Sequence, residues 1–274
     1  MSTNPLKQFF RRPSVYLKLP SGGVGYPEGA IDMPENGEIP VYPMTAIDEI
    51  TSKTPDSLFN GVAVIELIRS CIPDIKDPWA VTNVDLDPIL VAIRAATHGS
   101  TMEIETTCPE CKEASKFDVN LAGILAGFHP ADYSKTLTLG EVELKFKPMT
   151  YKEINDSSTQ QFHIQRSLGN IMSLTDEKER DVQGSALMRE IFDLTTELIA
   201  STIEYIKVPG ATVFEQEYVI EFLQKCDKAT YDKVKDFSTE LKQSTENKPL
   251  DITCPHCKHQ FNQAFNINVS DFFE

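Results

Sequence analysis

The alternation of apolar and polar residues predicts three short β-hairpins along the chain. The first begins at Thr101 and turns at the sequence Cys-Pro-Glu-Cys of residues 108–111. The second, residues 136–147, alternates leucine, valine and phenylalanine with polar residues around Gly140. The third lies in residues 250–274 and turns at Cys-Pro-His-Cys of residues 254–257. Hairpins of this kind predict small antiparallel sheets.

Apolar residues at helical spacing predict helices between the hairpins. Thr45 and Thr150 are each followed three residues later by an acidic residue, the pattern of a capping box at a helix start. Residues 55–71 are expected to form one helix. Asp87-Pro88 is expected to open another, which ends at Gly99 and in which Arg94 pairs with Asp85 or Asp87.

Residues 150–241 are expected to be mainly helical, with a break at Pro209-Gly210. Two apolar stripes indicate the buried helix faces on either side of this break. The first stripe comprises Leu187, Ile191, Leu194 and Leu198, and the second comprises Phe214, Tyr218, Val219, Phe222, Leu223 and Cys226.

The first 43 residues contain seven of the 17 prolines, spaced roughly every seven residues with glycines between them. Because proline lacks a backbone donor and disfavours helix in the residue before it, this segment is expected to form no regular helix or central strand. Aromatic and aliphatic residues punctuate it, including Phe9 and Phe10. We expect an extended arm that lies on a surface, either of this protein or of another subunit.

The charge of the chain is strongly acidic and unevenly distributed. The net charge is −15, yet residues 1–20 carry four basic and no acidic side chains, so the remainder carries −19. Such an acidic body should repel nucleic-acid phosphates, whereas the basic arm could contact an acidic protein neighbour. No run of eighteen apolar residues and no secretory signal is present, so we expect a protein without membrane spans that stays in a reducing cytoplasm.

Four of the six cysteines form two matched knuckles, Cys108 with Cys111 and Cys254 with Cys257. Each knuckle follows a strand-like segment, contains proline, and is followed at once by lysine. Two such pairs supply the four thiolates of a structural zinc site, and this spacing predicts one zinc ion per chain with no open position for catalysis. Cys71 and Cys226 are expected to be core residues.

Other uses of these cysteines are less compatible with the sequence. Two disulfides are disfavoured in a reducing compartment, and thioredoxin-like chemistry needs one reactive pair in a βαβ context. Four unrelated cysteines would not have matched flanks. His256 or His259 could replace a cysteine as a ligand. Closing a loop of the 142 residues between the knuckles costs conformational entropy on the order of 4 kcal/mol. Zinc binding to a structural site contributes on the order of 10 kcal/mol of apparent binding free energy, which exceeds that cost.

These patterns together predict an α+β fold. It would have a mainly helical body with small antiparallel hairpins, a split zinc-ribbon-like site of four cysteines, and an extended proline-rich N-terminal arm. We expect four parts along the chain. These are the arm (1–43), a helical core with the first knuckle (44–118), a hairpin plus helical insertion (119–248), and the second knuckle with a C-terminal strand (249–274).

Motifs of catalysis are absent from the sequence. It contains no phosphate-binding loop before Lys-Ser or Lys-Thr, no nucleophile elbow and no HExxH pair, and its histidines are scattered. We therefore expect no enzymatic activity. An enzyme that uses zinc only as support would need a pocket with convergent polar groups.

Several short motifs resemble the baseplate proteins of T-even-type contractile-tailed bacteriophages, in particular the family containing a baseplate hub component. The resemblance covers about residues 44–125 and the C-terminal knuckle, and depends on the order and spacing of the motifs. They are Lys53–Gly61 (KTPDSLFNG), Ser70–Pro73, Asp85–Asp87 with Ala92–Arg94, and the knuckles CPEC and CPHC.

The resemblance implies a non-enzymatic structural component of the tail baseplate, at or near its central hub. It would act by assembly with other baseplate, hub or tail-tube proteins, and would be present in multiple copies in a symmetric particle. It would be located in the host cytoplasm during assembly and in the tail baseplate of the virion afterwards. A transient hub assembly factor, absent from the mature virion, is one alternative. A zinc-ribbon nucleic-acid-binding protein is another, which the acidic body and the few lysines near the knuckles disfavour.

Overall fold

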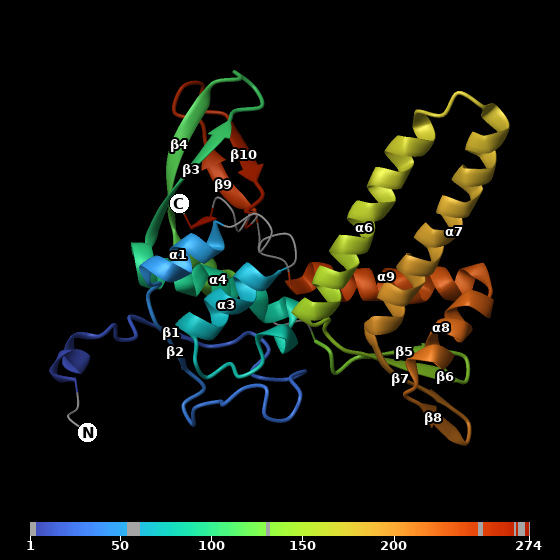
Figure 1. Cartoon of the computed structure of the whole chain (residues 1–274), viewed down its shortest axis with the longest axis horizontal. Coiled ribbons are helices and arrows are strands. Elements are labelled where there is room, and N and C mark those ends of the chain that lie inside the picture. The colour runs from blue at the N-terminus through green and yellow to red at the C-terminus, as the bar shows by residue number, and fades with distance from the viewer. Residues whose placement is uncertain are drawn as a thin grey trace. The chain divides into compact units, whose positions relative to one another are not determined.

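The protein forms two compact units, which are described separately here from a computed structural model (Figure 1). The structure describes residues 4–53, 61–129, 132–245, 249–265, 267 and 272–273. Unit 1 comprises Met1–Pro130 and Thr245–Glu274, and unit 2 comprises Ala131–Ser244. Unit 2 is therefore inserted between two segments of unit 1. Both units mix helices with small antiparallel sheets.

Unit 1 contains a helical core and three two-stranded ribbons. The core helices are α1 (Ala46–Ser52), α3 (Val62–Cys71), α4 (Asn83–His98) and α5 (Leu121–Gly127), with the 3₁₀ helices η1 (Pro5–Phe9) and η2 (Pro78–Ala80). The ribbons are β1 (Val15–Leu17) with β2 (Ile39–Val41), β3 (Thr101–Thr107) with β4 (Ala114–Asn120), and β9 (Leu250–Thr253) with β10 (Gln260–Gln263). The β3–β4 and β9–β10 ribbons confirm the expected first and third hairpins.

The capping patterns locate helix starts correctly in two of three cases. Thr45 and Thr150 both form complete capping boxes with the acid three residues later. The helix expected to open at Asp87 instead has Thr82 as its N-cap and contains Pro88 in its interior. The sequence Asn-Val-Asp before Leu86 extends the helix because Val84 and Asp85 are buried by the surrounding core. Gly99 ends the helix with a positive φ of 93°, as expected.

Residues 13–43 belong to the body of unit 1 and do not form a separate arm. β1 and β2 pair antiparallel and contact α4, and Leu17, Ile39 and Val41 are buried in the core of unit 1. Pro40 is tolerated in β2 because a two-stranded ribbon leaves backbone donors on its outer edges unused. Among the described N-terminal residues, η1 (Pro5–Phe9) projects from this body at the end of an extended segment (Figure 1).

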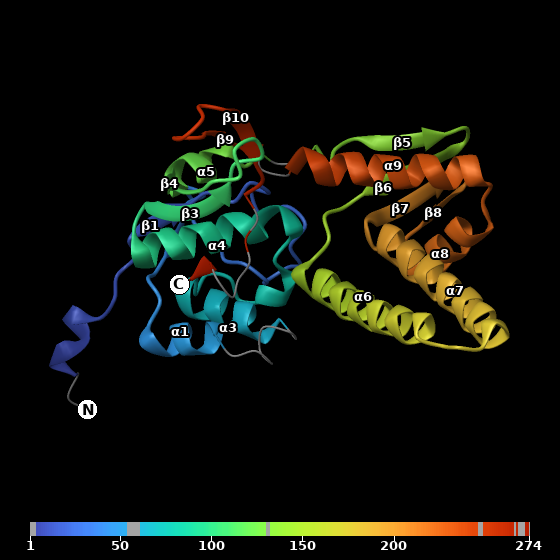
Figure 2. The ribbon, with the colours of Figure 1, turned by 90° about the horizontal axis from the view of Figure 1, so that it is seen from above.

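Unit 2 combines a four-stranded antiparallel sheet with a long helical hairpin (Figure 2). The sheet order is β5 (Thr136–Leu139), β6 (Val142–Phe146), β7 (Ile203–Val208) and β8 (Ala211–Val213). The hairpin consists of α6 (Tyr151–Met172) and α7 (Glu177–Ser201), and α8 (Gln216–Lys225) and α9 (Lys228–Thr245) complete the unit. The β5–β6 pair is the second hairpin expected from the sequence.

Two apolar clusters hold unit 2 together. One packs the sheet against α8 and α9, with the rings of Phe146 and Phe237 4.9 Å apart between centroids. The other joins α6 to α7 through Ile164, Ile171, Leu187 and Leu194, which confirms the aliphatic stripe. The aromatic stripe is only half buried, because Val219 and Leu223 face the core whereas Phe214 and Tyr218 are exposed. The Pro209-Gly210 break is the turn of the β7–β8 hairpin, which the helical expectation missed.

Residues 54–60 lie outside the described part of the chain. They include most of the KTPDSLFNG motif and the first residues of the helix expected over 55–71. The described part of that helix is α3, whose N-cap Gly61 has a φ of 74°.

A buried carboxylate fixes the loop after β1 to the start of α4. Asp85 accepts hydrogen bonds from the backbone and hydroxyl of Ser21, from Tyr26 and from Thr82. Burial raises the pKa of Asp85, while these hydrogen bonds oppose that shift. Arg94, which was expected to pair with Asp85 or Asp87, donates to the carbonyl of Phe272 and lies over its ring, 5.4 Å from the centroid.

Replacing Asp85 is expected to destabilise unit 1. Asp85→Ala leaves buried hydroxyls and an amide without their acceptor, which should lower the free energy of unfolding by about 2–4 kcal/mol. Asp85→Asn should cost less, because burial already favours a neutral side chain at this position. The measurement is urea denaturation followed by circular dichroism. Asp118→Asn, on an exposed position of β4, is the control and should change stability by less than about 0.5 kcal/mol.

Candidate metal centre

The four knuckle cysteines lie on the turns of two β-hairpins in unit 1. β3 and β4 pair in register from Thr101 opposite Asn120 to Thr107 opposite Ala114, so the turn between them holds Cys108 and Cys111. β9 and β10 pair from Leu250 opposite Gln263 to Thr253 opposite Gln260, so their turn holds Cys254 and Cys257. Each hairpin thus presents two thiols at one end of a strand pair.

The two knuckles have the same backbone conformation. In the first, the amide of Cys108 donates to the carbonyl of Glu113 and the amide of Lys112 donates to the carbonyl of Cys108, both at 3.0 Å. In the second, Cys254 donates to His259 at 2.9 Å and Lys258 donates to Cys254 at 3.0 Å. The matched flanking residues seen in the sequence therefore fold into matched turns.

In each turn, a lysine occupies the position with a left-handed backbone conformation. Lys112 and Lys258 have φ values of 62° and 63°, the left-handed conformation usually left to glycine. Among the described residues they are the non-glycine residues with positive φ. This shared conformation turns the chain back at the next residue, where the amides of Glu113 and His259 donate to the sulfurs of Cys111 and Cys257.

The sulfur atoms of the two knuckles come together. The Sγ atoms of Cys108 and Cys257 are 3.7 Å apart, and those of Cys111 and Cys254 are 3.6 Å apart. All four lie within 4.8 Å of one another. Four thiolates bound to zinc at 2.3 Å in a tetrahedron have sulfurs about 3.8 Å apart, whereas a disulfide needs about 2.05 Å. The cysteines are free thiols whose arrangement fits a tetrahedral ion.

The electrostatics of the cluster favour a cation at its centre. Hydrogen bonds from the backbone of Cys257 and His256 lower the pKa of the Cys254 thiol to about 6. The pKa of Cys111 is lowered by the Glu113 amide, but desolvation and the three neighbouring thiols outweigh this and raise it to about 12. Several thiolates so close together repel one another, and a divalent cation would remove that repulsion.

The cluster is partly protected from solvent and offers a closed set of ligands. Cys108 and Cys254 are buried, Cys111 is half-buried and Cys257 is exposed. His256 and His259 are not among the residues that converge in this group, and the imidazole of His259 lies parallel to the ring of Phe261. Four thiolates fill a tetrahedral shell, so an ion held here would have a structural role and would lack an open position for water.

A side-chain hydrogen bond also connects the two hairpins away from the knuckles. The hydroxyl of Thr106 on β3 donates to the side-chain oxygen of Gln263 on β10 at 2.7 Å. The remaining cysteines lie elsewhere: Cys71 is buried in α3, and Cys226 is half-buried with its thiol directed at the carbonyl of Leu223. The sequence spacing identified the cluster, but it gave no sign of the Thr106–Gln263 contact.

A closed four-thiol centre on paired hairpins defines a site that joins two distant parts of a chain. The family model described as T4 bacteriophage base plate protein matches residues 27–274, and this chain belongs to that family. This confirms the resemblance to T-even-type baseplate proteins. No protein with a curated description and no solved structure matches the chain.

The family assignment supports a structural role in the baseplate of the phage tail, in contact with other tail components. Within the described ranges, none of the helices combines the length and apolarity needed to cross a bilayer.

Metal analysis of the purified protein tests the centre. We expect one zinc ion per chain by elemental mass spectrometry, because two pairs of sulfurs across the knuckles already have nearly the spacing of a tetrahedral zinc shell and all four lie within 4.8 Å of one another. Cys254→Ser should reduce the content to well below one ion per chain. Cys226→Ser, a cysteine outside the cluster, is the matched control and should leave it unchanged. Native protein without bound metal would contradict the prediction.

Proposed function

We propose that this protein is a structural component of a contractile phage tail baseplate, at or near the central hub, and that it acts by assembly with other proteins. The match of a baseplate family model to residues 27–274 is the observation that carries this proposal. The finer position at the hub derives from the resemblance of residues 44–125 and the knuckles to hub-associated proteins.

The candidate metal centre supports a scaffold in this proposal. Cys108, Cys111, Cys254 and Cys257 bind one structural zinc ion, which joins the β3–β4 hairpin to the β9–β10 hairpin. Since unit 2 is inserted between these hairpins, the ion closes unit 1 around the insertion point. Protein sulfurs fill all four coordination positions of the ion, which favours a structural role over a catalytic one.

The surface of unit 2 supports an assembly role. Met172 at the end of α6 and Val182 and Met188 on α7 are 73%, 71% and 61% exposed. Flexible methionine side chains are common at surfaces that bind other proteins. The net charge of −15 disfavours nucleic acid as a partner.

The family and the surface features described above would also fit a transient assembly factor. The copy number of the protein in finished virions distinguishes a structural component from such a factor. Purified virions and assembly intermediates should be compared by quantitative mass spectrometry. We expect the protein in both, at a fixed ratio to the hub proteins. Presence in intermediates with absence from virions would assign it to assembly alone.

The zinc-dependent part of the proposal predicts a defect in tail assembly. A phage encoding Cys108→Ser with Cys257→Ser should yield few complete baseplates, because unit 1 loses its closure. The matched control is Cys226→Ser, which should assemble normally. Electron microscopy of lysates and plaque counts provide the measurement, and full assembly of the double variant would contradict this role of the metal.

A further inference from the structure

The N-terminal segment, residues 4–12, exposes a group of large apolar side chains. Leu6, Phe9 and Phe10 are 61%, 76% and 56% exposed, on or beside the 3₁₀ helix η1. Figure 1 shows this helix projecting from the rest of unit 1. A cluster of exposed aromatic side chains on a projecting segment is typical of a region that binds another surface.

Arg11 fixes the base of the N-terminal segment to unit 1. Its guanidinium donates to the carbonyls of Pro43 and Ser70 and to the hydroxyl of Ser70, at 2.7–2.8 Å. It also pairs with Asp48 at 3.3 Å. The segment is therefore held at Arg11, while the residues before it are presented to the surroundings. Fixing the base lowers the conformational entropy that the segment loses on binding.

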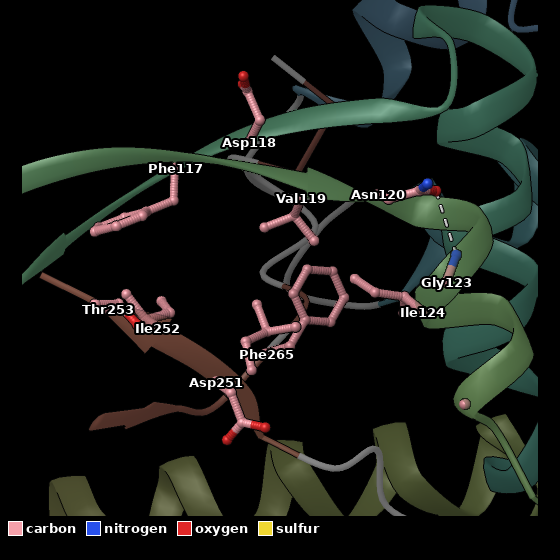
Figure 3. Close-up of a pocket in the computed structure, with 12 residues that line it drawn as sticks. Phe117, Asp118, Val119, Asn120, Gly123, Ile124, Asp251, Ile252, Thr253 and Phe265 are labelled. Carbon is pink, nitrogen blue, oxygen red and sulfur yellow. Dashed lines mark hydrogen bonds between the residues drawn. The ribbon is translucent and has the colours of Figure 1, made fainter. Parts of the chain in front are cut away.

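Unit 1 also contains an open apolar pocket of about 440 Å³, the β4–β9 pocket (Figure 3). Phe117 and Val119 of β4, Ile124 of α5, Ile252 of β9, and Phe265 direct their side chains toward its interior. This volume is in the range of sites that hold a small ligand or a few side chains. Gly123 lies on its wall, and a side chain added there would enter open space.

The charges of the pocket and of the N-terminal segment are complementary. Asp118 and Asp251 lie on the strands that form the pocket, exposed and pointing away from its apolar interior (Figure 3). In the N-terminal segment, Lys7 and Arg12 lie beside the exposed phenylalanines, and residues 1–20 contain no acidic side chain. The segment therefore offers aromatic groups with flanking positive charge to a pocket of aromatic groups with flanking negative charge.

We propose that the N-terminal segment of one copy of this chain docks in the β4–β9 pocket of a second copy. Phe9 and Phe10 enter the pocket, and Lys7 and Arg12 pair with the carboxylates beside it. The contact is head-to-tail, so a pair of copies keeps one free pocket on the first copy and one free segment on the second, and repetition yields a ring or a chain of copies. This contact goes beyond the proposed function and holds whether or not the protein occupies the hub.

Two full-length variants test the two sides of the contact. Phe9→Ala with Phe10→Ala removes the docking side chains, and Gly123→Trp fills the pocket from an exposed helix position. Each should weaken self-association in analytical ultracentrifugation by about tenfold or more. The matched controls are Phe214→Ala with Tyr218→Ala, also exposed aromatics, and Gly169→Trp, also at an open helix position. They should associate as the wild type does.

Mixing the two variants provides the decisive result. The phenylalanine variant retains a free pocket and the tryptophan variant retains a free segment, so together they should form a one-to-one complex although each alone is a monomer. A synthetic peptide of residues 4–12 should dissociate wild-type oligomers, and the same peptide with both phenylalanines replaced by alanine should not. A monomeric wild type, or self-association that Gly123→Trp leaves intact, would overturn the proposal.

Discussion

The meeting of four thiols from two distant hairpins is the contact on which the architecture of unit 1 depends. The β3–β4 and β9–β10 ribbons each have two strands, and such ribbons are marginally stable by themselves. Their sulfurs lie 3.6–3.7 Å apart across the two knuckles, close enough to repel when ionised and spaced to share a cation. An ion bound at this point would join the two weak ribbons into one stable structure.

Polar contacts elsewhere in unit 1 also join segments that are distant in the sequence. Asp85 joins the loop after β1 to α4, and Arg94 on that helix binds the carbonyl and ring of Phe272 near the end of the chain. Phe273 is among the largest fully buried side chains. The segment after the insertion therefore returns to the helical core as well as to the first knuckle, and unit 1 is completed only by residues that follow unit 2 in sequence.

Sequence reasoning succeeded where one local pattern determines the structure. The capping boxes at Thr45 and Thr150 and the cysteine knuckles each depend on residues three positions apart, and all were identified correctly. It failed where tertiary burial outweighs local preference. Pro88 predicted a helix start, but the core placed it inside α4. The proline-rich segment predicted a surface arm, whereas Leu17, Ile39 and Val41 of its second part are buried in the core of unit 1. The left-handed lysines 112 and 258 carry no signal in composition at all.

The insertion of unit 2 has a consequence for the order in which the protein folds during its synthesis. A ribosome completes residues 131–244 before it makes Cys254, Cys257 and Phe272, which Arg94 of α4 contacts. Domains generally fold as units while the chain is being made, so unit 2 can become native while unit 1 still lacks its second hairpin. The final step of folding is then the capture of a late segment by an early one, and an ion bound by the four thiols would make that step depend on the supply of metal in the cell.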